Sequence, residues 1–316
     1  MVVIAAVALA LVATPAASGM ARRAGLLDHP GPLKVQTRSV PYLGGLAVLV
    51  AATPGLAIGQ PAWLVPLALA LVLGTLDDAR TLAPHGRLAG EVVVGLVAGA
   101  LVPAGVAQPW AALATALVVV VLINAVNLID GLDALAAGVS LVSAIGFAIA
   151  LDGDDRTVAL ATAGALAGFL VYNRPPARIY LGDGGSYLLG TALAVLLVSA
   201  WGHGRELALS LGAVLFVAFP VAEVAFAVVR RARARAPLFT GDRGHLYDQL
   251  AQRGLSTLAT SLVCAGLQAA LVALGLVATR TEPVASLVIV VVTALALVIG
   301  AAAGGFLSST SPRSAG

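Results

Sequence analysis

Apolar residues occur along this chain in long runs, and short polar breaks separate one run from the next. Most runs have about 17 to 24 residues, enough for a helix to cross the hydrocarbon core of a bilayer. About eleven such helices are expected, near 1–18, 42–59, 62–76, 89–107, 110–128, 134–151, 157–172, 186–201, 207–229, 256–279 and 284–307. The pattern therefore predicts an all-α polytopic membrane protein, with a single integral membrane domain over residues 1–316.

Composition agrees with this fold class. Hydrophobic residues make up 60% of the chain and charged residues 10%, whereas soluble domains have about 25% charged residues. A water-soluble globule is thereby excluded. The net charge is only +3, so no basic surface for nucleic acid is expected. Cys264 is the one cysteine, which excludes an intrachain disulfide and argues against a zinc site.

The basic residues predict the orientation. The first run lacks the basic start of a secretory signal, and Arg22 and Arg23 follow it, so we expect a retained helix with its N-terminus outside. Alternating crossings then place 15 Lys and Arg residues on one side and 3 on the other. Because short basic loops stay in the cytoplasm, the basic side and the C-terminus are expected to be cytoplasmic.

Polar residues gather near the expected cytoplasmic ends of the helices. Asp77 and Asp78 end the third run, where exposed carbonyl groups already make the helix end partly negative. Two interpretations stay open for this pair. The carboxylates are either solvated and paired with Arg80 or Arg87, or they bind a divalent cation or a positive centre of a substrate.

A second motif, NAVNLIDGLD, spaces Asn124, Asn127, Asp130 and Asp133 three residues apart. The first three fall within an arc of about 120° on a helix, which forms one polar stripe on an otherwise apolar surface. Hydrogen bonding between helices would explain a single asparagine. Four polar groups beside Gly131 favour a ligand site.

The third motif is the NRPPARIYLGDGGSYLLG stretch. Pro175 and Pro176 are expected to stop the seventh helix, and Asp183 to sit in a glycine-rich turn before the eighth, with Ser186 as a cap. Free amides at such a helix start suit phosphate, and Asp183 could hold Mg²⁺ there. Tyr180 offers a ring for stacking.

The longest expected cytoplasmic loop covers 230–255. We expect its run of four arginines to enforce topology or to touch anionic lipid headgroups. Arg243 and His245, around the glycine of TGDRGH, have the character of site residues. Glu91 and Glu223 are intramembrane acids, although Glu223 follows Pro220 and could instead satisfy backbone groups freed by a bend.

Together these blocks resemble the polyprenyl-phosphate N-acetylhexosamine-1-phosphate transferases of glycosyltransferase family 4, which include undecaprenyl-phosphate GlcNAc-1-phosphate transferase and phospho-N-acetylmuramoyl-pentapeptide transferase. The resemblance spans roughly residues 28–253, and it adds the VPYLGG block after Lys34 and the DRGHLYD block. Three positions differ from the family pattern. Tyr247 and Asp248 stand where the family usually has histidines, and Gln36 stands where a histidine is common.

The resemblance implies transfer of a sugar-1-phosphate from a UDP-sugar to polyprenyl (undecaprenyl) phosphate, which releases UMP at the cytoplasmic face of the plasma membrane. This reaction is the first membrane step of cell-envelope glycan synthesis. It implies Mg²⁺ (or Mn²⁺) as cofactor, with Asp183 as its ligand. The other implied roles are catalysis for Asp77, Asp78 and Asp130, nucleotide binding for Asn173, Tyr180, Gly131, Leu132 and Asp133, and phosphate or substrate binding for Lys34, Asn127, Arg243 and His245.

Other functional classes stay open at this point. A cation-coupled transporter would also place carboxylates and asparagines in helices, but it predicts them near the bilayer midplane. A prenyltransferase would leave the GDGGS turn unexplained. A catalytically inactive relative is a further alternative, and a homodimer is left open.

Overall fold

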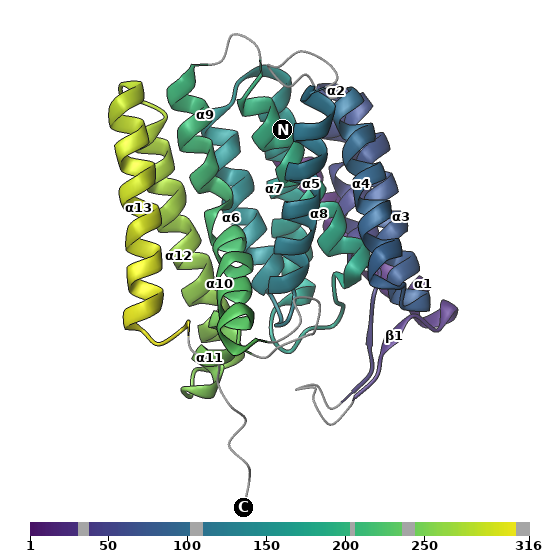
Figure 1. Cartoon of the computed structure of the whole chain (residues 1–316). Coiled ribbons are helices and arrows are strands. Elements are labelled where there is room, and N and C mark those ends of the chain that lie inside the picture. Colours follow the sequence, from purple (N-terminus) through teal and green to yellow (C-terminus); the bar gives the residue numbers. More distant parts are fainter. Residues whose placement is uncertain (31–37, 102–109, 203–205, 236–243, 308–316) are drawn as a thin grey trace, which may run out of the picture.

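The computed structural model describes residues 1–30, 38–101, 110–202, 206–235 and 244–307, and these residues form one helical bundle (Figure 1). Its elements are α1 (Val2–Ala24), β1 (Leu27–Asp28), β2 (Val40–Pro41), α2 (Gly44–Gly59), η1 (Pro61–Trp63), α3 (Leu64–Arg80), α4 (Pro84–Leu101), α5 (Trp110–Ile129), α6 (Leu135–Ala150), α7 (Gly153–Asn173), α8 (Gly182–Ala200), α9 (Leu207–Ala213), η2 (Val214–Val217), α10 (Ala218–Ala234), α11 (Leu246–Gln252), α12 (Thr257–Ala278) and α13 (Pro283–Ala303).

Each of the expected apolar runs coincides with helical structure in the described part of the chain, so the all-α polytopic fold class is confirmed. Seven helical segments there are long and apolar enough to cross a membrane: α1, η1 with α3, α5, α8, α9 to α10, α12 and α13. Helices α2 and α6 are apolar but shorter. Eleven crossings therefore remain a prediction.

Helix α8 forms the centre of the bundle. It packs against α2, α3 and α5, and all of its residues except Asp183 are buried. Its small residues allow neighbouring backbones to approach closely, as is common between helices in membranes. A Cβ added to Gly74 of α3 would lie 2.2 Å from the carbonyl oxygen of Asp183. The end of α3 is thus held directly against the start of α8.

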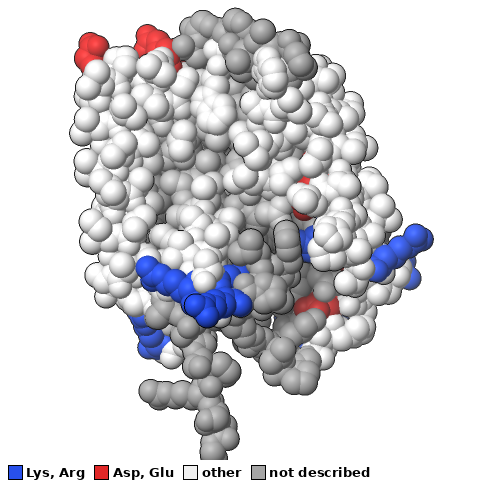
Figure 2. Space-filling view, in the orientation of Figure 1, with Lys and Arg blue, Asp and Glu red and all other residues white. Residues whose placement is uncertain are grey.

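The two ends of the bundle differ in charge. Lys and Arg side chains gather near the end where the β1–β2 hairpin and α11 lie, whereas acidic side chains appear at both ends of the same face (Figure 2). Arg22 and Arg23 end α1, and Arg231 and Arg233 end α10. This asymmetry is the one that the sequence predicts, and below we call this end the basic end.

The chain bends between α9 and α10, where η2 interrupts the helix. Pro220 lacks an amide hydrogen, so the carbonyl of Phe216 loses its usual helical donor. Gln268 of α12 replaces it: its Nε2 donates to Phe216 O at 2.6 Å, and its Oε1 accepts from Phe219 N at 3.1 Å. The alternative that Glu223 satisfies this bend is therefore wrong, because a residue of another helix does so.

Candidate active site

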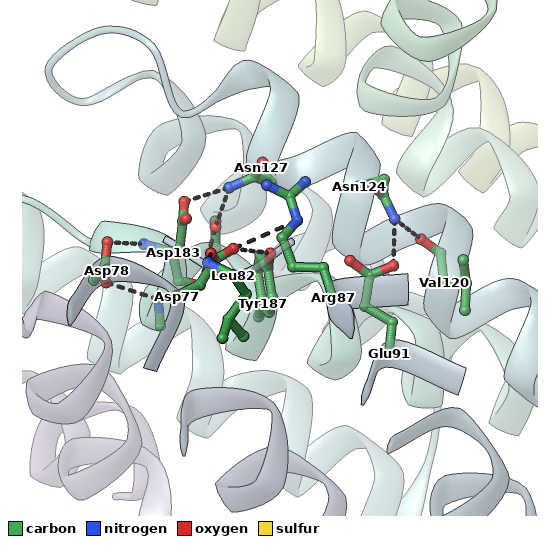
Figure 3. A network of polar contacts seen from close by, with 12 residues as sticks. Asp77, Asp78, Leu82, Arg87, Glu91, Val120, Asn124, Asn127, Asp183 and Tyr187 are labelled. Atoms are coloured by element: carbon green, nitrogen blue, oxygen red, sulfur yellow. Dashed lines mark hydrogen bonds and ion pairs between the residues drawn. The ribbon is translucent and has the colours of Figure 1, made fainter. Parts of the chain in front are cut away.

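Three helix ends meet at the basic end of the bundle and bring the predicted acids together. Asp77 and Asp78 belong to the last turns of α3, Asn127 to the last turn of α5, and Asp183 to the first turn of α8. Figure 3 shows these side chains pointing toward one another. Residues separated by more than a hundred positions thus form one polar cluster, as the motifs predict.

Asp78 caps the start of α8. Its Oδ1 accepts a hydrogen bond from Asp183 N at 3.0 Å, and its Oδ2 accepts one from Gly184 N at 3.2 Å. A carboxylate is favourable there because the first amides of a helix lack partners within the helix and carry partial positive charge. Gly182 permits the approach, since it adopts φ +71° and an added Cβ would lie 2.6 Å from Asp78 Oδ2.

This geometry corrects the expectation for the GDGGS stretch. The stretch is the first turn of α8 rather than a loop before it, because the helix begins at Gly182. Ser186 does not cap the helix: its hydroxyl donates to Asp183 O at 3.2 Å and accepts from Asn127 Nδ2 at 3.1 Å. The sequence predicts that free amides at this helix start bind phosphate. Two of these amides, those of Asp183 and Gly184, instead donate to the Asp78 carboxylate.

Asp77 is buried and engaged by the protein itself. Its Oδ1 accepts from Leu82 N at 2.8 Å and its Oδ2 from the Tyr187 hydroxyl at 2.9 Å. Arg87 lies 3.4 Å from Oδ2 and is partly exposed. Of the two interpretations given for the LDD pair, pairing with a nearby arginine describes Asp77, with Arg87 as the partner.

Asn127 connects α5 to the acid of α8. Its Nδ2 donates to Asp183 Oδ1 at 2.7 Å. The Asp183 carboxylate also lies beside that of Asp77 (Figure 3). An amide donor on one oxygen fixes the orientation of Asp183 and leaves lone pairs on both oxygens for a ligand.

Asp130 follows α5 in the turn before α6 and is partly buried. Burial raises its pKa well above the ordinary aspartate value, and the nearby Asp183, Asp78 and Asp133 raise it further. Its carboxylate makes no hydrogen bond within the described part of the chain. The raised pKa means that this environment disfavours the ionised carboxylate, and a positively charged ligand bound beside Asp130 would favour that form.

Asn124 does not join this cluster, although it shares the predicted stripe. Its Nδ2 donates to Glu91 Oε2 at 2.6 Å and to Val120 O at 2.9 Å (Figure 3). The pair links α5 to α4 inside the bundle, which is the hydrogen bonding between helices that explains a single membrane asparagine. It also gives Glu91 a structural partner.

The residues predicted to bind the nucleotide lie in the turn after α5, at the end of α7 and in the segment between α7 and α8, beside the acids. We call this group the nucleotide layer. Asn173 is buried at the end of α7, where its Oδ1 accepts from Ala134 N at 3.0 Å and its Nδ2 donates to Ile179 O at 2.9 Å. Asp133 Oδ2 accepts from Ala177 N at 2.8 Å. Burial raises the pKa of Asp133. Both side chains therefore tie the turn after α5 to the segment before α8.

Tyr180 is held in this segment by its backbone. Its amide donates to Pro41 O at 2.9 Å, and its carbonyl accepts from Gly44 N at 3.0 Å. The ring is half-buried. Burial, with the nearby Asp133 and Asp28, raises the pKa of the hydroxyl to about 12, so the group stays neutral under ordinary conditions.

The turn after α5 also contacts α11. Tyr247 donates its hydroxyl to Leu128 O at 3.2 Å, and an added Cβ on Gly131 would lie 2.4 Å from that hydroxyl. Leu132 packs against the core. Tyr247, which stands where the family usually has a histidine, therefore supports the turn that bears Asp130.

His245 lies behind Tyr247, with the two rings stacked 5.4 Å apart. Its Nδ1 is 3.5 Å from Glu223 Oε2 and 3.2 Å from Arg230 Nη2. Glu223 also accepts from Leu246 N at 3.2 Å. Sequence reasoning noted Glu223 but missed its role in holding the start of α11, because 22 positions separate it from His245.

Two predicted substrate-binding residues, Lys34 and Arg243, lie outside the described residues. Among the residues that are described, no group of three His, Cys, Asp or Glu side chains is arranged to hold a metal ion by itself. A magnesium site would therefore use fewer protein ligands, completed by substrate phosphates and water, as is usual for Mg²⁺.

Comparison with known proteins points to one family. The model of the family described as glycosyl transferase family 4 matches residues 61–201. A probable undecaprenyl-phosphate N-acetylglucosaminyl 1-phosphate transferase of Bacillus subtilis is 30% identical over 272 residues, which cover 78% of this chain and 75% of the relative. The decaprenyl-phosphate N-acetylglucosaminephosphotransferase of Mycobacterium tuberculosis is 32% identical, with 75% and 72% covered. A phospho-N-acetylmuramoyl-pentapeptide-transferase of Moorella thermoacetica is 35% identical over 50% of this chain and 60% of its own.

Proposed function

The chain belongs to glycosyl transferase family 4, and from that premise we propose that it transfers an N-acetylhexosamine-1-phosphate from a UDP-sugar to a polyprenyl phosphate. The products are a polyprenyl-diphosphate sugar and UMP. The relatives are named for such transfers to undecaprenyl or decaprenyl phosphate. The observation that carries the proposal is the meeting of Asp78, Asp130 and Asp183 at one bundle end, beside the predicted nucleotide layer.

Electrostatics explains why such a reaction needs this site. A lipid phosphate oxygen attacks the β-phosphorus of the UDP-sugar, so two negatively charged groups must approach each other. The second pKa of a phosphate monoester is about 6, so the attacking oxygen is already largely ionised at neutral pH. A carboxylate base contributes little in that case. Neutralising and positioning the phosphates is the main task.

The acids at the site fit a hard divalent cation. Asp183 and Asp130 offer carboxylate oxygens, which Mg²⁺ or Mn²⁺ prefers. Their mutual repulsion favours bound positive charge. When bound, the ion would neutralise phosphate charge and polarise the bond that breaks. Asn127 would fix the Asp183 carboxylate toward it.

The remaining predicted residues divide between the two substrates. Tyr180 would stack on the base, and the turn of Gly131 to Asp133 would accommodate the nucleotide with Asn173 as its support. His245, Lys34 and Arg243 would bind the substrate phosphates. These assignments rest on the family resemblance and, for the residues that the structure describes, on their shared position at the basic end.

We also propose eleven crossings, with the N-terminus outside and the C-terminus and the active site on the cytoplasmic side of the plasma membrane. The charge asymmetry of the bundle supports this orientation. Single cysteines at Arg80, Arg178 and Arg253, introduced after Cys264→Ser, should react with a membrane-permeant reagent only. Labelling of any of them by an impermeant reagent from outside would refute the orientation.

The function is tested with the purified protein, polyprenyl phosphate and a panel of UDP-sugars. The expected result is release of UMP together with one lipid-diphosphate sugar, identified by mass. Absence of product with every sugar would support the catalytically inactive alternative. The transporter alternative has no support among the relatives, and the clustered acids lie at helix ends rather than at the midplane.

A further inference from the structure

A cavity of about 600 Å³ lies at the basic end, outside the acidic cluster. Its lining includes the second half of α1, the residues at the start of β2 and the segment that follows α7. These elements contribute polar and charged side chains, among them Thr14, Ser18, Arg22, Arg38, Tyr172 and Arg178. None of the acids of the candidate active site is among the lining residues.

Three arginines from separate parts of the chain surround this cavity. Arg38 Nη2 donates to Ala177 O at 3.5 Å and lies near Asp133. The guanidinium groups of Arg22 and Arg178 make no hydrogen bond or ion pair within the described residues. Like charges gathered around one cavity repel each other, so an anion bound between them would relieve the repulsion.

The wall of the cavity is built around a proline in α1. Pro15 has no amide hydrogen, so the carbonyl of Leu11 loses its helical donor. The hydroxyl of Tyr172 donates to Leu11 O at 2.9 Å instead. This bond joins α1 to α7 beside the cavity, which Ser18 and Arg22 of α1 also line.

Thr14 is a second indication of a ligand. It is 1% exposed and lines the cavity, yet its Oγ1 has no hydrogen-bond partner. A threonine in a helix usually donates to the carbonyl four residues earlier, as Thr53 does in α2. A buried hydroxyl without a partner is costly, and a polar ligand in the cavity would supply one.

The position of the cavity identifies the kind of ligand. α1 is long and apolar enough to span the membrane, and Arg22 lies in its last turn. The cavity therefore opens where a spanning helix meets the headgroup layer. Basic pockets beside transmembrane helices on the cytoplasmic side bind anionic lipid headgroups. We propose that this cavity binds the phosphate of an anionic phospholipid, between Arg22, Arg38 and Arg178.

The proposal is tested by native mass spectrometry of the full chain in detergent, with phosphatidylglycerol or with phosphatidylcholine of the same acyl chains. The protein should retain phosphatidylglycerol preferentially. Loss of each arginine should weaken binding about fivefold, so Arg22→Gln with Arg178→Gln should lower affinity more than about tenfold. The matched control, Arg23→Gln with Arg80→Gln, removes the same charge from the basic end outside the cavity and should bind within about twofold of the unchanged protein.

The variant Thr14→Val distinguishes a direct contact between the lipid and the cavity from a general electrostatic attraction of anionic lipid to the basic end. It keeps the shape of the side chain and removes only the hydroxyl, so it should weaken phosphatidylglycerol binding without loss of thermal stability. Equal losses in the control pair, or unchanged binding in the cavity variants, would overturn the proposal. Equal stabilisation of the protein by glycerol phosphate, at the same concentration as the lipid, would assign the cavity to soluble phosphates and overturn the lipid assignment.

Discussion

The two acids at the end of α3 and the two acids opposite them share one cluster but differ in their partners. Asp77 and Asp78 accept hydrogen bonds from four protein groups: two backbone amides at the start of α8, the amide of Leu82 and the hydroxyl of Tyr187. Within the described residues, Asp130 and Asp183 accept one side-chain hydrogen bond between them, from Asn127. We call Asp77 and Asp78 the engaged pair, because protein donors already bind their oxygens. We call Asp130 and Asp183 the open pair, because most of their lone pairs are free to bind a ligand.

This difference separates the two functions of acidic residues in one site. A carboxylate that satisfies buried donors stabilises the fold, and its removal leaves those donors unpaired. A carboxylate with unsatisfied lone pairs and nearby negative charge is destabilising unless a ligand binds. The comparison therefore assigns ligand binding chiefly to Asp130 and Asp183, and the joining of α3 to α8 chiefly to Asp77 and Asp78.

The largest expected effect is that of metal removal. Since the open pair is proposed to hold Mg²⁺, chelation with EDTA should abolish sugar-phosphate transfer, and added Mg²⁺ or Mn²⁺ should restore it. Thermal unfolding should shift to a lower temperature without loss of the fold, because the open acids then lack the bound positive charge while the engaged pair keeps its hydrogen bonds. Full turnover in chelator would show that the open acids serve another purpose.

Asp183→Asn should lower kcat about a thousandfold, because one ligand oxygen becomes a neutral amide. The backbone amide of residue 183 still donates to Asp78, so the melting temperature should be nearly unchanged. Asp154→Asn is the matched control, since Asp154 is exposed in the first turn of α7 and its substitution should leave kcat unaltered. A stable, fully active Asp183→Asn protein would remove Asp183 from the metal site.

Asp77→Ala should act on stability instead. It leaves the Tyr187 hydroxyl and the Leu82 amide without an acceptor, which costs about 2 to 3 kcal/mol. The ion pair with Arg87 adds little, because Arg87 is partly exposed. Urea unfolding in detergent measures the change, and Tyr187→Phe with Asp77→Ala closes a double-mutant cycle. An Asp77→Ala protein with normal stability but no activity would contradict the structural role given to Asp77, since Asp77 would then act in catalysis.

Periodicity and residue type are sufficient to predict the fold class and the polar cluster. Helices follow from uninterrupted apolar runs, and Asn127, Asp130 and Asp183 were predicted because polar groups are rare and costly in such runs. Local patterns were less reliable at the start of α8. Serine after glycines indicated a cap at Ser186, but the carboxylate of Asp78, over a hundred residues away, occupies that position.

Other polar contacts were not predicted for the same reason. Asp155 is buried near the start of α7, where it accepts hydrogen bonds from Gln60 and Ser199. Gln268 gave no signal in an apolar run, although it satisfies the bend before α10. A polar residue whose partner lies on a distant helix cannot be recognised from its neighbours in sequence.

The smallest expected effect concerns Tyr180, which lies beside the open acids and has its backbone fixed by Pro41 and Gly44. Tyr180→Phe keeps the ring, so the KM for the UDP-sugar should be unchanged. Tyr180→Ala removes the stacking face and should raise KM about fivefold, or about 1 kcal/mol. Because the raised pKa, about 12, keeps the hydroxyl protonated below that pH, Phe removes no charge. The pH dependence of KM between pH 7 and 9 should therefore be the same for Tyr and Phe. Equal KM values for all three proteins would show that the ring only packs, and nucleotide recognition would then rest on the turn of Gly131 to Asp133.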